Sequence, residues 1–226
     1  MLYIVATPIG NLGDITDRAK EILGSCELVI AENPMHSKRL FNHFTLPKKR
    51  FLQFADFNEE SSLPKILEEI KKVEVGGGNT VLISDAGMPG ISDPGFRVVR
   101  AAVLAGITIS PIPGASAAVA ALAASGLPTD KFIFFGFPPK TEVKLVKLME
   151  EAKNIEATSV FYESPQRIVK TLGYIANAFP DSKVCVAREL TKIHEEFLRG
   201  AAKEISDILS ARPSIKGEIT VIVSFK

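Results

Sequence analysis

The chain has 226 residues, of which 46% are hydrophobic and 23% charged, and 27 Lys and Arg nearly balance 26 Asp and Glu for a net charge of +1. This composition is typical of a folded globular protein, and it excludes a disordered chain, a polybasic nucleic-acid coat and an acidic tail, although not a local basic patch. Cys26 and Cys185 form no CxxC pair and the first six residues are typical of a strand, not of a secretory leader, so we expect reduced thiols in a cytoplasmic protein. The longest low-polarity run, 115–124, is shorter than the ~20 residues of a membrane-spanning helix.

Strand and helix patterns alternate through the first half of the chain. We expect strands at 2–6, 27–32, 80–84 and 107–112, and helices that begin near 14–16 behind small polar caps, at 37–44, from 62 to about 73, from 93 to about 105 and at 116–125. Ser62 and Pro64 are expected to start one helix, and Asp93 and Pro94 to open another as cap residue and first-turn proline, with Gly106 at its end. This order predicts a mostly parallel sheet with helices on both faces.

The second half also alternates, with a cluster of prolines (128, 138 and 139) near the change of character. We expect strands at 132–137, 158–163, 183–189, 195–199 and 218–225, and helices at about 142–153, 165–178 and 201–210. Ser164 is expected to cap the second of these helices, with Pro165 in its first turn. The chain is thus predicted to form two α/β domains, 1–115 and 116–226, with a ligand cleft between them.

Three loops follow strands and precede helices, at the edge of a parallel sheet where α/β folds bind ligands. In the first, SDAGMPGISDPG at 84–95, glycines allow close approach of a ligand and Asp85 can accept hydrogen bonds from an ammonium or a ribose hydroxyl; the other interpretation is a turn in which Asp93 caps the next helix. In the second, PGASA at 113–117, small side chains allow either an adenine or a thioether to approach, or close packing of the Ala-rich helix. The third is TPIGNLG at 7–13. Neither GxGxxG nor GxxxxGK[ST] is present, so nicotinamide and nucleoside-triphosphate motifs are absent.

A basic stretch without acids runs from 33 to 55. It holds four phenylalanines (41, 44, 51 and 54) and five cations, Lys38, Arg39, Lys48, Lys49 and Arg50. Basic groups that hold phosphates and rings that stack on unpaired bases would make an RNA contact, whereas the plainer interpretation is a solvated face over a hydrophobic stripe. The three histidines, at 36, 43 and 194, lie in no HExxH motif and near no cysteine pair, so we expect no metal.

Five motifs in this order resemble the tetrapyrrole methylase superfamily of S-adenosylmethionine-dependent methyltransferases. They are ATPIGNLGDIT (6–16), SDAGMPGISDPG (84–95), PGASA (113–117), FYESPQR (161–167) and ARELTKIHEE (187–196). They are closest to the bacterial branch that 2′-O-methylates a cytidine of 16S rRNA, of which this chain resembles a diverged, shortened member. The resemblance implies two α/β domains, the first with a mostly parallel sheet and the second with a mixed one, a cofactor cleft between them, and a homodimer.

The resemblance also implies functional residues and a substrate. Those expected to bind S-adenosylmethionine, with S-adenosylhomocysteine as product, are Pro8, Ser84, Asp85, Ala86, Gly87, Met88, Ser116, Ala117, Tyr162 and Leu190. The substrate would be RNA of the small ribosomal subunit, and we expect phosphate contacts from Lys38, Arg39, Arg167 and Arg188. A ribose hydroxyl needs a base or a positive charge to lose its proton, and the candidates are Glu32, Lys192 and Glu195, although structural salt bridges would explain each of them equally well.

Two motifs depart from the pattern of that branch. An Asp-Thr-Arg word is expected after the second strand, where this chain has the stretch Ala31-Glu32-Asn33-Pro34-Met35-His36. A histidine-rich word near 54–59 is reduced to Asn58-Glu59. The basic carboxyl-terminal extension of the branch is also absent from this sequence. These changes concern substrate contacts, whereas the donor-binding words are intact. The alternatives are therefore a methyltransferase acting on a corrinoid or porphyrinoid ring, and a donor-binding module without catalysis.

Overall fold

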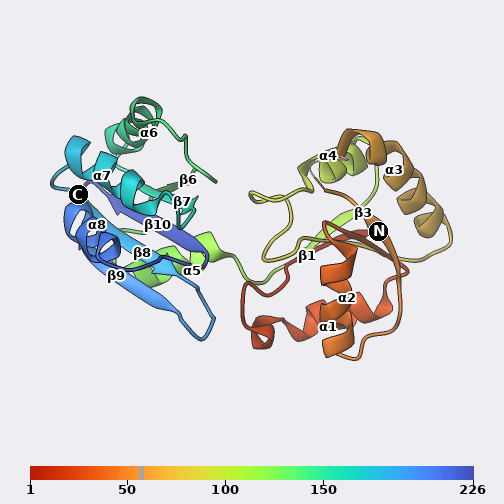
Figure 1. The fold of residues 1–226 in the computed structure, drawn as a ribbon. Coiled ribbons are helices and arrows are strands. Elements are labelled where there is room, and N and C mark those ends of the chain that lie inside the picture. Colours follow the sequence, from red (N-terminus) through yellow and green to blue (C-terminus); the bar gives the residue numbers. More distant parts are fainter. Residues whose placement is uncertain (56–58) are drawn as a thin grey trace. The chain divides into compact units, whose positions relative to one another are not determined.

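The structure is a computed structural model that describes residues 1–55 and 59–226, with the side chain of Glu59 outside the description. Of the altered Asn58-Glu59 word, Asn58 and the side chain of Glu59 accordingly lie outside the described residues. The chain forms two compact units, Met1–Ser116 and Ala117–Lys226, whereas the sequence predicts a boundary after residue 115. Each unit contains a β-sheet with helices packed on it (Figure 1).

The first unit contains a five-stranded parallel sheet. Its strands are β1 (Leu2–Val5), β2 (Leu28–Ala31), β3 (Arg50–Gln53), β4 (Thr80–Ile83) and β5 (Ile109–Ile112), in the order β3-β2-β4-β1-β5. The parallel sheet confirms the prediction, and β2 and β4 are buried throughout, as their continuous apolar sequences indicate. Strand β3 was not predicted, because this edge strand carries a charged residue at one end and a polar one at the other.

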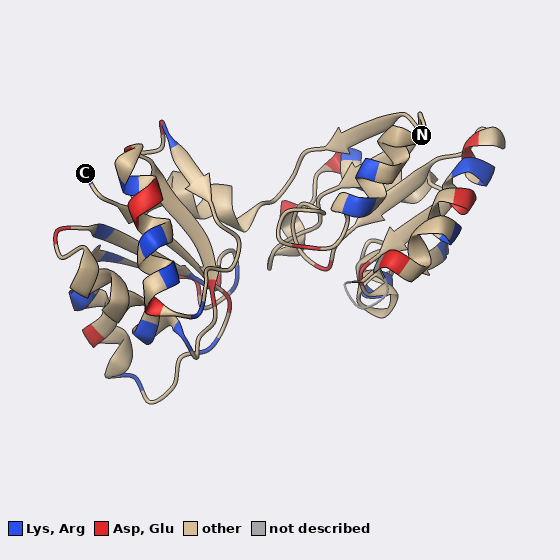
Figure 2. Cartoon of the chain, turned by 90° about the horizontal axis from the view of Figure 1, so that it is seen from above, with Lys and Arg blue, Asp and Glu red and all other residues tan. Residues whose placement is uncertain are grey.

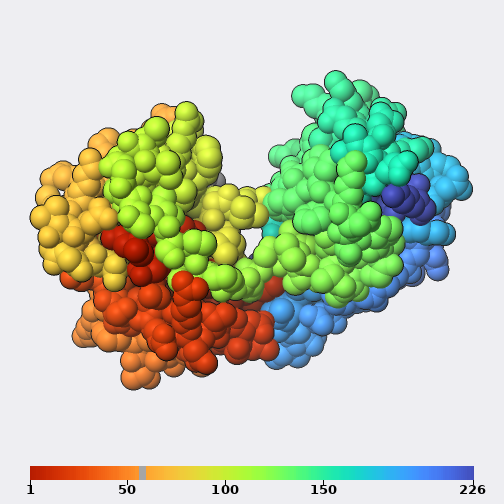
Figure 3. All heavy atoms as spheres, turned by 180° about the vertical axis from the view of Figure 1, so that it is seen from behind, coloured from red at the N-terminus to blue at the C-terminus, as the bar shows by residue number. Residues whose placement is uncertain are grey.

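Helices cover both faces of this sheet, as predicted. The helices α1 (Asp17–Ser25) and α2 (Pro34–His43) pack with Val5, Val81 and Ile83 on one face. The helices α3 (Glu59–Val75) and α4 (Phe96–Leu104) pack with Ile4 and Leu82 on the other, because alternate strand residues point to opposite faces. Figure 3 shows α3 and α4 next to each other on the surface of this unit. A short 3₁₀ helix, η1 (Leu12–Asp14), follows β1.

Three features of these helix ends can be compared with the predictions. Thr16 caps α1, accepting a hydrogen bond from the Ala19 N–H at 3.1 Å, as expected. The predicted start of α4 at Asp93 is wrong: the helix begins at Phe96, and its N-cap Gly95 provides no side-chain cap. Glycine suits this position because φ is 141° and a Cβ would lie 3.2 Å from the Gly90 nitrogen. The predicted start of α3 is also wrong, since the helix already begins at Glu59 and Pro64 lies inside it.

The second unit begins with α5 (Ala117–Ser125) and contains a mixed sheet, as the family resemblance implies. Its strands are β6 (Phe132–Phe134), β7 (Thr158–Glu163), β8 (Lys183–Arg188), β9 (Glu196–Ala201) and β10 (Ile219–Ser224), in the order β6-β7-β10-β8-β9. Only β6 and β7 pair in parallel among these described strands. The helices α6 (Glu142–Asn154), α7 (Ile168–Ala178) and α8 (Ala202–Ser210) contribute to the core cluster on the sheet, and α5 also contacts β7, β8 and β10.

The predicted cap of α7 is wrong. The helix begins at Ile168, and its N-cap residue Arg167 provides no side-chain cap. The Ser164 carbonyl instead accepts hydrogen bonds from the Arg167 and Ile168 N–H groups, so residues 165–167 form a separate turn. Along the described residues, none of the helices combines the length and the hydrophobicity needed to cross a bilayer.

Candidate functional site

The loops after β1 and β4 are joined where the two strands end. The Thr7 N–H donates to the Gly87 carbonyl at 2.9 Å, and the Gly87 N–H donates back to the Thr7 carbonyl at 3.0 Å. The Thr7 hydroxyl also donates to the Ser84 carbonyl at 3.3 Å. Thr7 and Ser84 are buried. Backbone hydrogen bonds thus join the two predicted ligand-binding loops, 7–13 and 84–95.

The loop after β5 packs against the same place. A Cβ on Gly114 would lie 2.8 Å from the Ala6 Cβ, closer than any side chain tolerates, so only glycine allows this approach. Gly87 has φ +83°, a conformation that glycine adopts without strain, and a Cβ there would lie 3.6 Å from the Ala115 carbonyl oxygen. The glycines of two predicted motifs therefore bring three loops together at the carboxyl edge of the sheet.

A pocket of about 170 Å³ opens at this edge. Its lining residues come from the loop after β1, from helix α2 and from the end of β4: Thr7, Pro8, Leu12, His36, Ser37, Arg39, Leu40, Ile83, Ser84 and Asp85. The chain leaves β2 toward β3 on one side and leaves β4 toward β5 on the other. The sheet is therefore at its topological switch point between β2 and β4, the position where open α/β sheets bind ligands.

Asp85 is the most unusual polar group of the pocket. Its backbone N–H donates to Glu32 Oε2 at 3.3 Å, which ties the loop to the end of β2. Its side-chain oxygen Oδ1 is buried and has no hydrogen-bond partner among the described residues. A buried acceptor without a donor costs about 1–3 kcal/mol, and native proteins rarely leave one unexplained. A bound ligand that carries N–H or O–H groups would supply the missing donor.

Helix α2 contributes the basic side of the pocket. Asn33 caps it through Oδ1, which accepts from the Met35 and His36 N–H groups at 3.1 and 3.3 Å, and Pro34 occupies its first turn. The helix therefore begins three residues before the predicted position 37, which brings His36 to the pocket. Sequence reasoning named Arg39 as a contact but missed His36, because the histidine matches no motif of spacing.

Several other residues of the predicted basic stretch have structural contacts. Phe41 and Phe54 are buried in the core, and the Phe41 and Phe51 rings meet edge to face with centroids 5.2 Å apart. The Lys49 ammonium donates to the Gly24 carbonyl at 2.7 Å, and Arg50 pairs with Glu69 at 2.5 Å. The hypothesis of a ring-stacking RNA surface is therefore wrong for Phe41 and Phe54, which belong to the hydrophobic stripe. Figure 2 shows positive and negative segments interspersed along the helices.

Two of the expected donor-binding residues lie near the ends of strands in the second unit. Tyr162, near the end of β7, meets the rings of Phe134 and Phe137 edge to face, with centroids 4.9 and 5.7 Å apart. Leu190, just after β8, is buried. Ala117 opens α5, and Ser116 precedes it as the last residue of the first unit.

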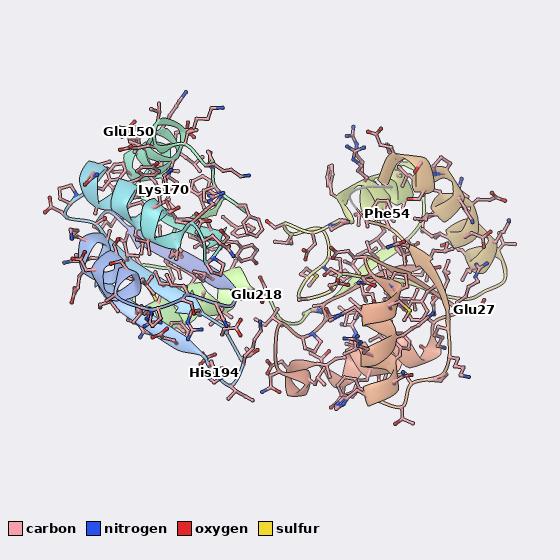
Figure 4. The ribbon with its side chains drawn as sticks, in the orientation of Figure 1. Glu27, Phe54, Glu150, Lys170, His194 and Glu218 are labelled. Atoms are coloured by element: carbon pink, nitrogen blue, oxygen red, sulfur yellow. The ribbon has the colours of Figure 1, made fainter. Side chains whose placement is uncertain are left out.

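The turn after β8 has a strained backbone that several contacts hold in place. Glu189 has φ 53° and the β-branched Thr191 has φ 65°, a rare conformation that persists where the surroundings enforce it. The Lys192 ammonium donates to Glu189 at 2.9 Å and to Glu218 at 3.1 Å, and the Thr191 N–H donates to Glu195 at 2.7 Å. Figure 4 labels His194 and Glu218 at this end of the unit.

The contacts of this turn bear on two of the predicted catalytic residues. Burial lowers the pKa of the Lys192 ammonium, but the bonds to Glu189 and Glu218 outweigh it and hold the pKa above its usual value. Lys192 is therefore a cation at neutral pH that can stabilise negative charge but cannot accept a proton. Glu195 fixes the backbone of the turn.

Two arginines predicted to bind phosphate are used inside the second unit. Arg188 donates to Glu196 at 2.9 Å and to the carbonyls of Lys216 and His194. Arg167 pairs at 3.0 Å with the fully buried carboxylate of Glu163. Both guanidinium groups position their own turns, and these internal contacts explain their charge without a phosphate.

Glu196 is the centre of an ion-pair network and provides a test of stability. Hydrogen bonds from Arg212 lower the pKa of Glu196 from 4.5 to about 2. Burial opposes this shift, and the hydrogen bond from Arg188 adds to it. Because the pKa of Glu196 is lower in the folded than in the unfolded protein, its ionised form stabilises the fold at any pH above 4.5. This stabilisation is lost as the pH falls from 4.5 toward 2. Glu196→Gln should therefore lower the free energy of unfolding at pH 7 by about 2 kcal/mol, and the difference from the parent should shrink across that window.

Urea unfolding between pH 7 and pH 2 measures this difference. Glu150→Gln, an exposed carboxylate on α6 without a partner among the described residues, is the control and should change stability by less than about 0.5 kcal/mol. An equal loss for both variants, or a difference independent of pH, would exclude the network as its cause.

The described residues contain no group of three or more His, Cys, Asp or Glu side chains arranged to hold a metal ion.

Known proteins resemble this chain both in sequence and in fold. The family model "Tetrapyrrole (Corrin/Porphyrin) Methylases" matches residues 1–206. A protein of Halalkalibacterium halodurans named ribosomal RNA small subunit methyltransferase I is 43% identical over 222 residues, 98% of this chain and 75% of that protein. The protein of the same name from Thermotoga maritima is 41% identical over 226 residues, which cover all of this chain and 98% of that protein.

Solved structures share the fold at low sequence identity. The methyltransferase CobJ matches with a TM-score of 0.72 at 18% identity, covering 99% of this chain and 93% of that one. Diphthine synthase matches with a TM-score of 0.71 at 14% identity, covering 99% of this chain and 89% of that one. At these identities the likeness concerns the fold alone.

Proposed function

Because the chain belongs to the tetrapyrrole (corrin/porphyrin) methylase family, we propose that it transfers a methyl group from S-adenosylmethionine to a ribose 2′-oxygen of small-subunit ribosomal RNA. The observation that carries the proposal is identity of 41–43% over 98–100% of the chain to proteins named for that RNA. The similarity to CobJ, at 18% identity, supports the fold and does not favour a ring substrate. In keeping with this substrate and with the family resemblance, we propose a cytoplasmic homodimer.

The pocket edge fits the methyl donor. S-adenosylmethionine supplies a methyl group on a positively charged sulfur and carries an ammonium and ribose hydroxyls as donors. The unpartnered Oδ1 of Asp85 is an acceptor for such donors. Bare backbone is presented at Gly87, whose φ of +83° favours glycine, and at Gly114, where there is no room for a Cβ. We therefore propose that the donor is held in the first unit by Pro8, Ser84, Asp85, Ala86, Gly87, Met88 and Ser116. From the second unit, we propose Ala117, Tyr162 and Leu190 as donor contacts.

The chain's own groups divide the remaining work. Methyl transfer is an in-line displacement, so the main task is to align the nucleophile with the methyl group. Lys192, held as a cation by two carboxylates, would stabilise negative charge. Glu32 supports the Asp85 loop through its bond to the Asp85 N–H. Lys38 and Arg39, exposed on α2, are the proposed phosphate contacts.

The experiment that tests the function offers three methyl acceptors in parallel. Labelled S-adenosylmethionine is incubated with the protein and unmodified small ribosomal subunits, naked 16S rRNA or a cobalt-corrin precursor. Label in RNA at a ribose oxygen is expected. Label in the corrinoid alone would overturn the substrate, and donor binding without transfer to any acceptor would indicate a binding module.

Charge reversal on α2 is expected to separate substrate use from donor binding. Lys38→Glu combined with Arg39→Glu should raise the KM for the RNA substrate at least roughly tenfold, because two phosphate contacts become repulsive. Binding of S-adenosylmethionine, followed by calorimetry, should not change. The control is Lys144→Glu with Lys147→Glu, which alters net charge equally on exposed positions of α6. Equal KM effects in both pairs would point to a general charge effect and remove the α2 contact.

A further inference from the structure

We propose that the pocket of the first unit receives the target ribose, and that His36 accepts the proton of its 2′-hydroxyl. This inference rests on the proposed function and assigns the general base of the reaction. It goes beyond the sequence, which offered Glu32, Lys192 and Glu195 for this role and gave no reason to single out a histidine.

The three residues that the sequence offers as catalytic groups, two acids and one lysine, already have partners within the protein. Glu32 accepts the Asp85 N–H at 3.3 Å, and Glu195 accepts the Thr191 N–H at 2.7 Å. Lys192 is held in its protonated form between two carboxylates. None of them lines the pocket between β2 and β4. Each therefore has a structural task that deprotonating a hydroxyl would disturb.

His36 lies where a base is needed. It sits in the first turn of α2 with its backbone N–H bound by the Asn33 side chain, so the position of the imidazole is set by a capped helix end. The side chain is exposed and lines the pocket together with Pro8 and Asp85. Within residues 1–55 and 59–226, its ring forms no hydrogen bond or ion pair. The imidazole is thus available to a substrate beside the loops proposed to hold the methyl donor.

Arg39 makes the same pocket fit a nucleotide. It follows His36 by three residues, the spacing that places two side chains on one side of a helix. It lines the pocket, is exposed and has no partner among the described residues. A guanidinium beside an imidazole suits a ribose with its adjoining phosphate: Arg39 would pair with the phosphate oxygens while His36 faces the hydroxyl.

The proposed step balances atoms and electrons. The 2′-hydroxyl gives its proton to a nitrogen of His36, and its oxygen forms the new bond to the methyl carbon. The electron pair of the broken carbon–sulfur bond stays on sulfur, so the sulfonium becomes a neutral thioether. The imidazolium then loses its proton to water. Histidine suits this role because its ordinary charge change falls between pH 5 and 8.

The other described histidines provide contrasts. His43 lies at the opposite end of α2 and its ring meets the Phe44 ring edge to face, with centroids 4.7 Å apart. His194 lies in the turn between β8 and β9 of the second unit (Figure 4). His43→Gln is therefore a matched control on the same helix, outside the pocket.

Single-turnover methylation of small-subunit RNA tests the assignment. His36→Gln should slow the chemical step about a hundredfold, whereas calorimetry should give unchanged S-adenosylmethionine affinity and filter binding an RNA affinity within about threefold of the parent. His36→Asn should behave alike, and His36→Ala should regain part of its rate in added imidazole. His43→Gln should keep the full rate.

The other outcomes are distinct. A parent-like rate for His36→Gln would overturn the assignment, as would a loss confined to RNA affinity, which would make His36 a contact only. Because His36 is exposed, its substitution should not lower the melting temperature. If the melting temperature fell nevertheless, recovery of the rate of His36→Ala in added imidazole would still identify His36 as the base. Failure of the parent enzyme to methylate RNA would instead refute the proposed function.

Discussion

Asp85→Ala is expected to weaken S-adenosylmethionine binding ten- to hundredfold, corresponding to about 1.4–2.8 kcal/mol, without destabilising the fold. The loss of affinity follows if the buried, unpartnered Oδ1 accepts a hydrogen bond from the donor molecule. The unchanged or higher stability follows from the same fact, because deleting an acceptor that has no partner relieves an unfavourable burial. Calorimetric titration and thermal unfolding of the same preparation measure both effects.

Two further variants make this result specific. Asp85→Asn keeps the shape and one acceptor oxygen but loses the negative charge, so its affinity for S-adenosylmethionine should fall between those of the parent and of Asp85→Ala. Asp181→Ala removes an exposed carboxylate of the second unit and should change neither quantity. Unchanged affinity in the Asp85 variants would mean that the orphaned oxygen has no role in binding.

Gly114→Val is expected to abolish measurable donor binding and to lower the free energy of unfolding by about 2–3 kcal/mol. Even the first carbon of a side chain would lie 2.8 Å from the Ala6 Cβ, and neither group can move without moving backbone. The strain would separate β5 and its loop from β1, and with them the loops held by the Thr7–Gly87 hydrogen bonds. Calorimetry for the ligand and urea unfolding for stability provide the measurements.

The control for this variant is a glycine in open surroundings. A Cβ on Gly173, within α7, would have no neighbour inside 4 Å, so Gly173→Ala should stabilise the protein by about 0.5–1 kcal/mol through helix propensity. Normal donor binding by Gly114→Val would show that the approach of the three loops is not required for the site.

The fold could be predicted largely because its signals are local and repeated. Buried strands such as β4 have continuous apolar sequences, and Thr16 and Gly106 mark helix ends by side-chain and backbone chemistry that act within one turn. The errors arose where tertiary packing decides. Gly95 takes the cap of α4 because the loop before it packs against Gly90 and Leu82, which no local pattern reveals.

The site could be predicted in part, for a similar reason. Glycine-rich loops after strands identify a ligand edge, and the structure places Asp85 and Pro8 in one pocket at this edge. The partners of long side chains could not be read from sequence: Arg167 and Arg188 have the same charge as Arg39 but are held by Glu163 and Glu196. His36 was missed because its importance depends on a helix that begins three residues earlier than its pattern indicates.

The strand order of the first unit also has a consequence for synthesis of the protein. Among the described strands, β1 pairs with β4 and β5, which begin at Thr80 and Ile109, so the first strand to be made must wait for both of these partners. At about 5–20 residues per second, the ribosome needs several seconds to deliver these partners. During that interval the apolar β1 has exposed edges, and we expect it to be the segment of the nascent chain that most needs chaperone protection.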